Sequence, residues 1–209
     1  MYKHKKLRLA SLTPQTALIL LREGNTRFVQ NLMEHRDHLE QINESKDEQH
    51  PFAVILSCID SRTSAELIFD QGLGDILSIR IAGNIVNDDI LGSIEFGCKI
   101  AGAKIIVILG HSNCSAVKGA CDGIKMGYIT GLLNKIQPSV SAELKLNNSD
   151  ESRFIDNVAI RNVINTVREI NDRSSIVKEL IGTKQIAIIG GMHNLNDGKV
   201  SFIESTLAE

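Results

Sequence analysis

Four short apolar runs, separated by segments of a different pattern, are the feature that most limits how this chain can fold. The first, Phe52 to Ser57, is apolar almost without interruption, which is typical of a strand covered on both faces of a parallel sheet. The others are Ile76 to Arg80, Lys104 to Leu109 and Gln185 to Ile189. Asn196-Asp-Gly198 then predicts a turn into a last strand, Val200 to Ile203.

Helical patterns lie between these runs. Phe154 to Ile170 carries apolar side chains at helical spacing, and Asn87 predicts the start of a helix that ends at Gly102. Thr63-Ser-Ala-Glu66 is predicted to be a capping box that opens a short helix. Strands that alternate with helices indicate an α/β fold. We expect a mainly parallel central sheet of about four strands plus a C-terminal edge strand, flanked by helices.

Residues 1–50 are predicted to form an N-terminal helical arm. Thr13-Pro14 predicts a helix N-terminus, with a helix to about Gly24 and a second one over Asn25 to Met33. The polar segment Arg36 to His50 is expected to be a loop or an exposed helix.

Residues 51–209 are expected to form the α/β core. Within it, the polar segment Pro138 to Arg153 predicts a surface loop rather than a linker between domains. Because the chain has 209 residues and no internal repeat, we expect a single domain over residues 1–209.

The balance of charge argues against a nucleic-acid partner. The chain has 23 basic and 25 acidic side chains, whereas nucleic-acid binding normally requires a basic patch. The one basic cluster, Lys3 to Arg8, is interpreted as a solvated tail.

No apolar stretch approaches the roughly 18 residues of a membrane span. The apolar run Thr16 to Leu21 is interrupted upstream by Pro14 and lacks a cleavage pattern, so it predicts a helix rather than a signal peptide. We therefore expect a cytoplasmic protein, in which the four cysteines need not pair.

Potential metal ligands follow two of the predicted strands. The first strand leads into Cys58-Ile-Asp60-Ser-Arg62 and the third into Gly110-His111-Ser-Asn-Cys114. Parallel sheets place their sites at the carboxyl ends of strands, so these side chains are expected to converge. Two thiolates and an imidazole suit zinc better than magnesium or calcium. Asp60 can either occupy a fourth coordination position or release it, with Arg62 as the bidentate partner that draws it away.

The two motifs, Cys58-x-Asp60-Ser-Arg62 and His111-x-x-Cys114, resemble the signature motifs of the β-carbonic anhydrases. Intervening segments are similar to the family too, among them Arg80-Ile-Ala-Gly-Asn84 and Leu91-Gly-Ser-Ile-Glu95. The resemblance extends from the helix at Thr13 to the turn at Gly198 and so covers nearly the whole chain.

This resemblance implies one Zn²⁺ per chain, held by Cys58, His111 and Cys114. Asp60 would bind the zinc in a closed form and pair with Arg62 in an open form. The implied reaction is the reversible hydration of carbon dioxide to bicarbonate and a proton, by attack of zinc-bound hydroxide. The resemblance also implies a homodimer or homotetramer.

Two further positions are predicted to contact substrate. The family pattern has glycine after the second cysteine, where this chain has Ser115, whose backbone N–H would help to receive carbon dioxide or bicarbonate. Gly83 is interpreted either as a point of close backbone approach near the pocket or as a tight turn. Ser115 leaves open hydrolysis of a related linear substrate such as carbon disulfide or carbonyl sulfide. The other alternative is a non-catalytic scaffold with structural zinc, against which the presence of Asp60 with Arg62 argues.

The remaining cysteines and one histidine receive structural interpretations. Cys98 is predicted to be a packed core thiol and Cys121 a structural thiol rather than a ligand. His193 is predicted to lie in a solvent-facing loop, the alternative being a position at the mouth of the site.

Overall fold

The computed structural model describes residues 11–146 and 153–205. Its centre is a five-stranded sheet with the order β2-β1-β3-β4-β5. The strands are β1 (Ala53–Ser57), β2 (Ile76–Arg80), β3 (Ile105–His111), β4 (Ala187–His193) and β5 (Val200–Ser205). The first four are parallel, and β5 pairs with β4 in the antiparallel direction. The predicted α/β fold, with four parallel strands and a C-terminal edge strand, is therefore confirmed.

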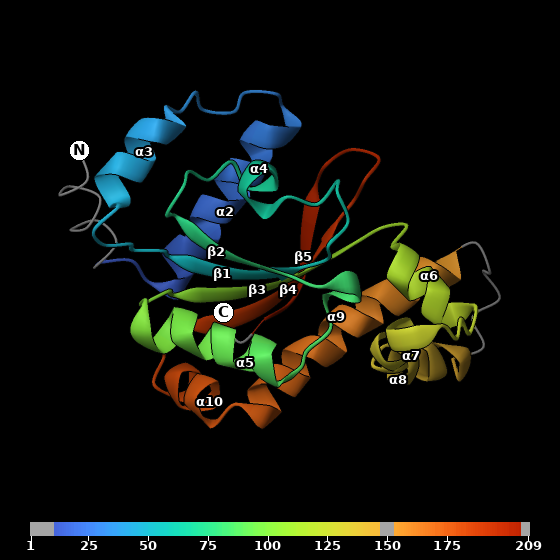
Figure 1. Ribbon diagram of the computed structural model, residues 1–209. Coiled ribbons are helices and arrows are strands. Elements are labelled where there is room, and N and C mark those ends of the chain that lie inside the picture. The colour runs from blue at the N-terminus through green and yellow to red at the C-terminus, as the bar shows by residue number, and fades with distance from the viewer. Residues whose placement is uncertain (1–10, 147–152, 206–209) are drawn as a thin grey trace.

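Helices cover both faces of this sheet. They are α2 (Pro14–Val29), α3 (His38–Ser45), α4 (Ala65–Ile68), α5 (Asp88–Glu95), α6 (Ser115–Cys121), α7 (Gly127–Asn134), α8 (Gln137–Leu144), α9 (Phe154–Arg173) and α10 (Ser175–Gly182). Two short turns of helix, η1 (Ala82–Asn84) and η2 (Phe96–Ile100), follow β2 and α5. Helices α2 and α4 lie on one side of the sheet, and α5 and α10 on the other (Figure 1).

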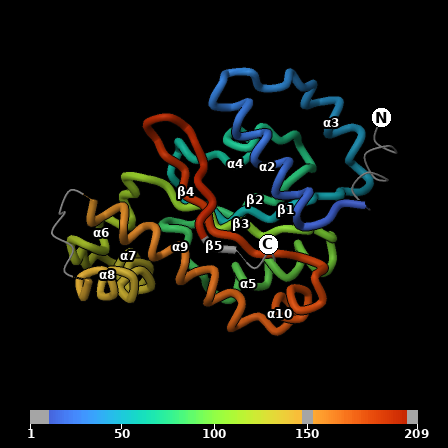
Figure 2. Tube along the Cα trace, turned by 180° about the vertical axis from the view of Figure 1, so that it is seen from behind, coloured from blue at the N-terminus to red at the C-terminus, as the bar shows by residue number. Residues whose placement is uncertain are grey.

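The alternation of side chains along the strands separates two apolar cores. Ala53 and Ile55 of β1 pack towards α2 and α4, while Val54 and Leu56 pack towards α5, α9 and α10. A third apolar cluster, beyond the carboxyl ends of β1 and β3, is built by α6, α7, α8, α9 and the loop segments around them. Figure 2 shows α9 running from the α6–α8 group to α10, so that one helix spans the molecule.

The N-terminal arm is fastened to the core by polar as well as apolar contacts. Thr13 caps α2 through a capping box with Thr16, and Pro14 occupies the first turn as predicted. Asn25 of α2 is buried; its Nδ2 donates to the carbonyls of Ile68 and Gly198 at 3.1 and 3.0 Å. The arm therefore packs as an integral layer of the fold.

Several predicted boundaries are wrong in informative ways. The two helices predicted over residues 13–33 are one helix, α2, because Gly24 lies against the backbone of Phe69 rather than ending the helix. Thr63 does not cap α4: Ser64 is the N-cap residue, and the Thr63 hydroxyl donates instead to the carbonyl of Asp60 at 3.0 Å.

Other predicted segments are only partly right. Much of the loop predicted over Pro138 to Arg153 belongs to α8, while residues 147–152 lie outside the described part of the chain. The basic cluster Lys3 to Arg8 also lies outside it. Among residues 11–146 and 153–205, every helix is too short or too polar to span a lipid bilayer.

Candidate metal centre

Two neighbouring parallel strands bring three potential ligands together. Cys58 directly follows β1, and His111 is the last residue of β3, the parallel neighbour of β1. Cys114 is the N-cap residue of α6. The two Sγ atoms lie 4.0 Å apart, and the ligand atoms of all three residues lie within 4.8 Å of one another. All three residues are buried, so the sequence-predicted cluster forms a compact group.

The His111 ring is oriented by its own strand end. Its Nδ1 lies 2.9 Å from the carbonyl oxygen of Ser112, which can only accept a hydrogen bond. Nδ1 must therefore carry the proton, which leaves the lone pair of a neutral ring on Nε2. Nε2 is buried and makes no hydrogen bond to the described residues. This tautomer is the one that a metal ligand bound through Nε2 requires.

The two thiols lie close enough for one to donate a hydrogen bond to the other. A hydrogen bond from Cys114 lowers the pKa of Cys58 to about 4, although burial acts in the opposite direction. The same bond, together with burial, raises the pKa of Cys114. Burial also disfavours charge on His111, but the neighbouring Cys58 sulfur outweighs it and raises the pKa of the ring. A cation bound among these groups would replace the proton that lies between the two sulfurs.

Asp60 lies beside the ligand group and is held by Arg62. Arg62 Nε and NH2 donate to the two Asp60 carboxylate oxygens at 2.9 and 2.8 Å, forming the predicted bidentate pair. This pair lowers the pKa of Asp60 below its usual range. Asp60 Oδ2 is 4.0 Å from His111 Nε2, so the carboxylate borders the ligand group.

Arg80 fixes the backbone of the Cys58–Asp60 loop. Its Nε donates to the Cys58 carbonyl at 3.1 Å, and its NH2 donates to the Asp60 carbonyl at 2.6 Å. From the sequence, Arg80 was predicted only to belong to a segment similar to the family, with no role of its own. Its position at the end of the predicted strand was the available signal, because the carboxyl ends of parallel strands lie together. In the fold, Arg80 is in register with Ser57, next to Cys58.

The two positions predicted to contact substrate lie next to the ligands. Gly83 is buried, and its N–H donates to Cys58 Sγ at 3.4 Å. Ser115 is the exposed first residue of α6, directly after Cys114. Both residues thus border the cluster, and their contact with substrate stays a prediction.

His193 is not a loop residue. Strand β4 continues through Gly190 and Gly191, so His193 lies in the sheet, paired in register with His111 and only 3% exposed. The strand continues because the two glycines admit close neighbours: a Cβ on Gly190 would lie 2.8 Å from Val163 Cγ1. Burial lowers the pKa of His193 to about 4, which keeps its ring neutral. The prediction of a solvent-facing loop is therefore wrong.

The other two cysteines lie outside the ligand group. Cys98 is buried in the apolar core, and burial raises its pKa to about 12, as expected of a packed thiol. Cys121, at the end of α6, is half-buried. The predictions that neither thiol is a ligand agree with this placement.

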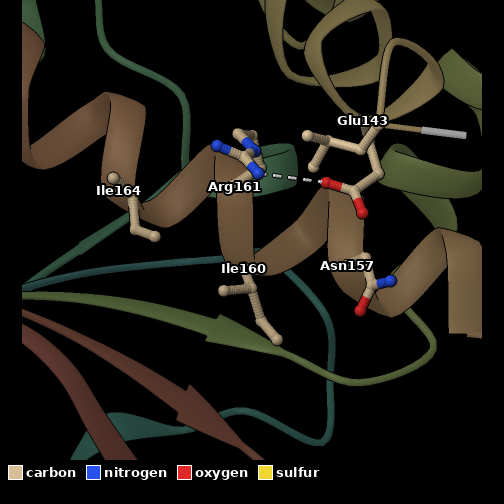
Figure 3. A pocket seen from close by; sticks show the side chains of 6 residues that line it. Glu143, Asn157, Ile160, Arg161 and Ile164 are labelled. Atoms are coloured by element: carbon tan, nitrogen blue, oxygen red, sulfur yellow. Dashed lines mark hydrogen bonds and ion pairs between the residues drawn. The ribbon is translucent and has the colours of Figure 1, made fainter. Parts of the chain in front are cut away.

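A separate hollow of about 210 Å³ lies between α8 and α9 and contains none of the ligand residues. Figure 3 shows Arg161 of α9 paired with Glu143 of α8, at 3.3 Å, beside Asn157 and Ile160. The Glu143 side chain is only 4% exposed. This ion pair helps to fasten α9 against the helices that surround the metal centre.

Comparison with known proteins agrees with the geometry. The family model described as carbonic anhydrase matches residues 53–200. Carbonic anhydrase 2 of Mycobacterium tuberculosis is 37% identical, with the alignment covering 89% of this chain and 91% of the relative. The carbonic anhydrase of Mycolicibacterium smegmatis is 33% identical, covering 90% and 92%.

Solved structures share the fold at lower identity. A tetrameric β-carbonic anhydrase of Sordaria macrospora superposes with a TM-score of 0.73 at 21% identity, covering 80% of this chain and 92% of its own. The β-carbonic anhydrase CafA of Aspergillus fumigatus gives 0.71 at 23% identity, covering 93% and 92%. With the ligand group at the carboxyl edge of the same sheet, the chain belongs to the β-carbonic anhydrase family.

Proposed function

We propose that this chain catalyses the reversible hydration of carbon dioxide to bicarbonate and a proton, with one zinc ion per chain held by Cys58, His111 and Cys114. The observation that carries the proposal is the buried Cys–His–Cys group, placed beside a carboxylate that a guanidinium holds back. Relatives that carry the name carbonic anhydrase, aligned over most of the chain, support it.

The donor set fits zinc. Two thiolates and an imidazole favour zinc over magnesium or calcium, and three protein ligands leave a fourth position for solvent. The unpartnered Nε2 of His111 and the close pair of sulfurs provide all three donors within one buried group. Bound here, zinc would supply its usual chemistry: it lowers the pKa of a water molecule so that attack on carbon dioxide proceeds near neutral pH.

We assign Asp60 and Arg62 the role of a gate. Arg62 occupies both Asp60 oxygens, which keeps the carboxylate off the fourth position. The carboxylate remains close enough to His111 to accept a hydrogen bond from solvent at that position and to orient it. When Asp60 turns away from Arg62, it competes for the same position and closes the site.

Gly83 and Ser115 are the proposed substrate-binding positions. The proposal is supported by the Gly83 N–H, which donates to Cys58 Sγ, and by the position of Ser115 directly after Cys114. The alternatives, hydrolysis of carbon disulfide or carbonyl sulfide and a non-catalytic zinc scaffold, are not favoured by the relatives, which are named carbonic anhydrases.

We also propose that the chain acts in the cytoplasm as a homodimer or homotetramer. Free thiols at all four cysteines suit a reducing compartment. Strand β2 is an edge of the sheet, and beside it lies a hollow of about 650 Å³ lined by Leu77 and by Phe96, which is 52% exposed. An exposed strand edge beside a hollow with apolar side chains in its lining is suited to pairing with another copy. Light scattering would give the mass of the assembly.

The test combines metal analysis with stopped-flow hydration of carbon dioxide. We expect one zinc per chain and rapid hydration that increases with pH. Cys114→Ser should lose most of both, whereas Cys121→Ser, a matched change on the same helix and outside the ligand group, should retain them. Zinc-loaded protein that hydrates no carbon dioxide from neutral to alkaline pH would refute the proposal. Turnover of carbon disulfide in its place would favour that alternative.

A further inference from the structure

A chain of hydrogen bonds leads from helix α9 to a ligand sulfur. Asn162 Nδ2 donates to the Gly83 carbonyl at 2.9 Å, and the Gly83 N–H donates to Cys58 Sγ at 3.4 Å. The three residues come from three separate parts of the chain. Only the packing of α9 against η1 and the end of β1 brings them together.

Gly83 connects the two hydrogen bonds, through its N–H and its carbonyl. Its φ and ψ of 67° and 19° lie in the left-handed region, which glycine adopts without strain. A Cβ at this position would lie 2.7 Å from Ile136 Cδ1, so any larger residue would be strained and would also clash here. The N–H and the carbonyl lie in adjacent peptide planes joined at the Gly83 Cα, so at these φ and ψ values the direction of the carbonyl sets that of the N–H.

Asn162 is an unusual residue for its place. It is 3% exposed and lies on the buried face of α9, among the apolar residues Val158, Ala159 and Val163. Burying an amide is unfavourable unless it forms hydrogen bonds, and an apolar side chain would pack here without that cost. The bond from Nδ2 to the Gly83 carbonyl is therefore the feature that explains an asparagine at this position.

We propose that Asn162 is a positioning residue of the metal centre, which acts through Gly83 to aim an N–H at the Cys58 sulfur. The proposal rests on the zinc site of the proposed function and deepens it. Through this link, α9 sets the orientation of the Cys58 ligand and the charge left on its sulfur.

An N–H directed at a thiolate stabilises its negative charge and holds the sulfur in one orientation. Partners of this indirect kind change metal affinity or activity by about 10- to 100-fold when they are removed. Loss of the Asn162 amide leaves the Gly83 carbonyl without its donor, so the peptide groups on either side of Gly83 are held less firmly. The Cys58 sulfur then loses both its fixed direction and part of its charge stabilisation.

The test compares Asn162→Leu with Asn165→Leu. Asn165 is a matched control, because it lies on the same helix and its Nδ2 also donates at 2.9 Å, but to the Ser139 hydroxyl. Zinc affinity is measured by competition with a chelator, and the cobalt-substituted protein is examined for its sulfur-to-metal absorption band. We expect Asn162→Leu to bind zinc about tenfold more weakly and to shift the band, with Asn165→Leu unchanged in both.

Equal zinc affinities and equal cobalt bands in the two variants would overturn the proposal. If leucine at position 162 prevents folding, Asn162→Ser is used, since its short side chain cannot reach the Gly83 carbonyl. A measurement on the unmodified protein gives a second check: in cadmium-113-loaded protein, the Gly83 amide proton should show scalar coupling to the metal through Cys58. Absence of this coupling also counts against the proposal. These readouts need no catalytic activity, so they are separate from the test of carbon dioxide hydration.

Discussion

Asp60 and Asp70 lie on either side of α4 and both pair with arginine, yet their surroundings are opposite. Asp60 pairs with Arg62, two residues along the chain and 55% exposed. Asp70 has a fully buried side chain, held by Arg27 and Arg36 from the N-terminal arm. The first pair is local and borders solvent, while the second joins distant segments in the interior.

The difference shows how one chemical pair can serve two purposes. A carboxylate with one exposed, local partner can exchange it for another group at small cost. A carboxylate enclosed by two guanidinium groups cannot, because separation would leave desolvated charges unpaired. Asp60 is therefore suited to the proposed gate, and Asp70 to a permanent joint between the arm and the core.

The largest effect is expected from Asp70→Asn. The substitution keeps the shape of the side chain, and asparagine tolerates the positive φ of 45° at this position. It leaves Arg27 and Arg36 without their buried counter-charge, so we expect the free energy of unfolding to fall by about 3 kcal/mol. Urea denaturation of the zinc-loaded protein measures this.

Glu34→Gln is the control, since Glu34 also pairs with both arginines but its side chain is 60% exposed. It should change stability far less. Burial opposes the charge on Asp70, but hydrogen bonds from Arg36 and Arg27 outweigh it and hold its pKa below the usual value. A lowered pKa stabilises the fold above the unfolded value of about 3.9 and loses this effect as pH falls through the folded pKa. The deficit of Asp70→Asn should thus be complete at pH 7 and shrink in acid; a deficit that persists unchanged would contradict the charge argument.

The two regions also differ in how far the sequence predicts them. The Asp60 region follows from local patterns: apolar runs predict β1 and β3, and ligands at their carboxyl ends predict the cluster that forms. The Asp70 joint depends on residues more than 30 positions apart in the chain, and no pattern near Asp70 indicates its partners.

The same limit explains the errors at the site. The hydrogen bonds of Arg80 and Asn162 depend on which strands and helices become neighbours, and so does the burial of His193. The predicted strand ends at Ile189, whereas in the fold β4 continues through Gly190, which leaves room for Val163 of α9 and for Ile203 of the neighbouring strand β5. Periodicity predicts elements and their exposed faces, but it does not predict which distant backbone a polar side chain will meet.

The second effect tests the gate directly. In Arg62→Gln, Asp60 loses the bidentate partner that lowers its pKa and holds it away from the ligand group. We expect Asp60 to compete for the fourth position on zinc, so that solvent displaces it only at higher pH. Hydration activity at pH 7 should fall about tenfold, and the pH midpoint should rise by about one unit.

Stopped-flow rates from pH 6.5 to 9.5, with zinc content measured on the same samples, check this expectation. Arg62→Lys keeps the charge but not the two-pronged hydrogen bond, so its midpoint should lie between those of the wild type and Arg62→Gln. Identical profiles for all three proteins would show that Asp60 is as fixed as Asp70, which removes the proposed contrast.

The smallest effect is expected from Ser115→Gly, which restores the glycine typical of the family. Ser115 is exposed and begins α6, so its hydroxymethyl group can be removed without opening a cavity. The backbone N–H remains, and the added room should raise kcat/KM by no more than about threefold, or about 0.6 kcal/mol. The greater freedom of glycine should lower the free energy of unfolding by about 0.5 kcal/mol. Near Asp70 the opposite change, from glycine to a residue with a side chain, cannot be accommodated at Gly24. A Cβ there would lie 1.7 Å from the Phe69 carbonyl oxygen. A rise of tenfold or more in Ser115→Gly would mean that Ser115, and not the Asp60 gate, limits access to the site.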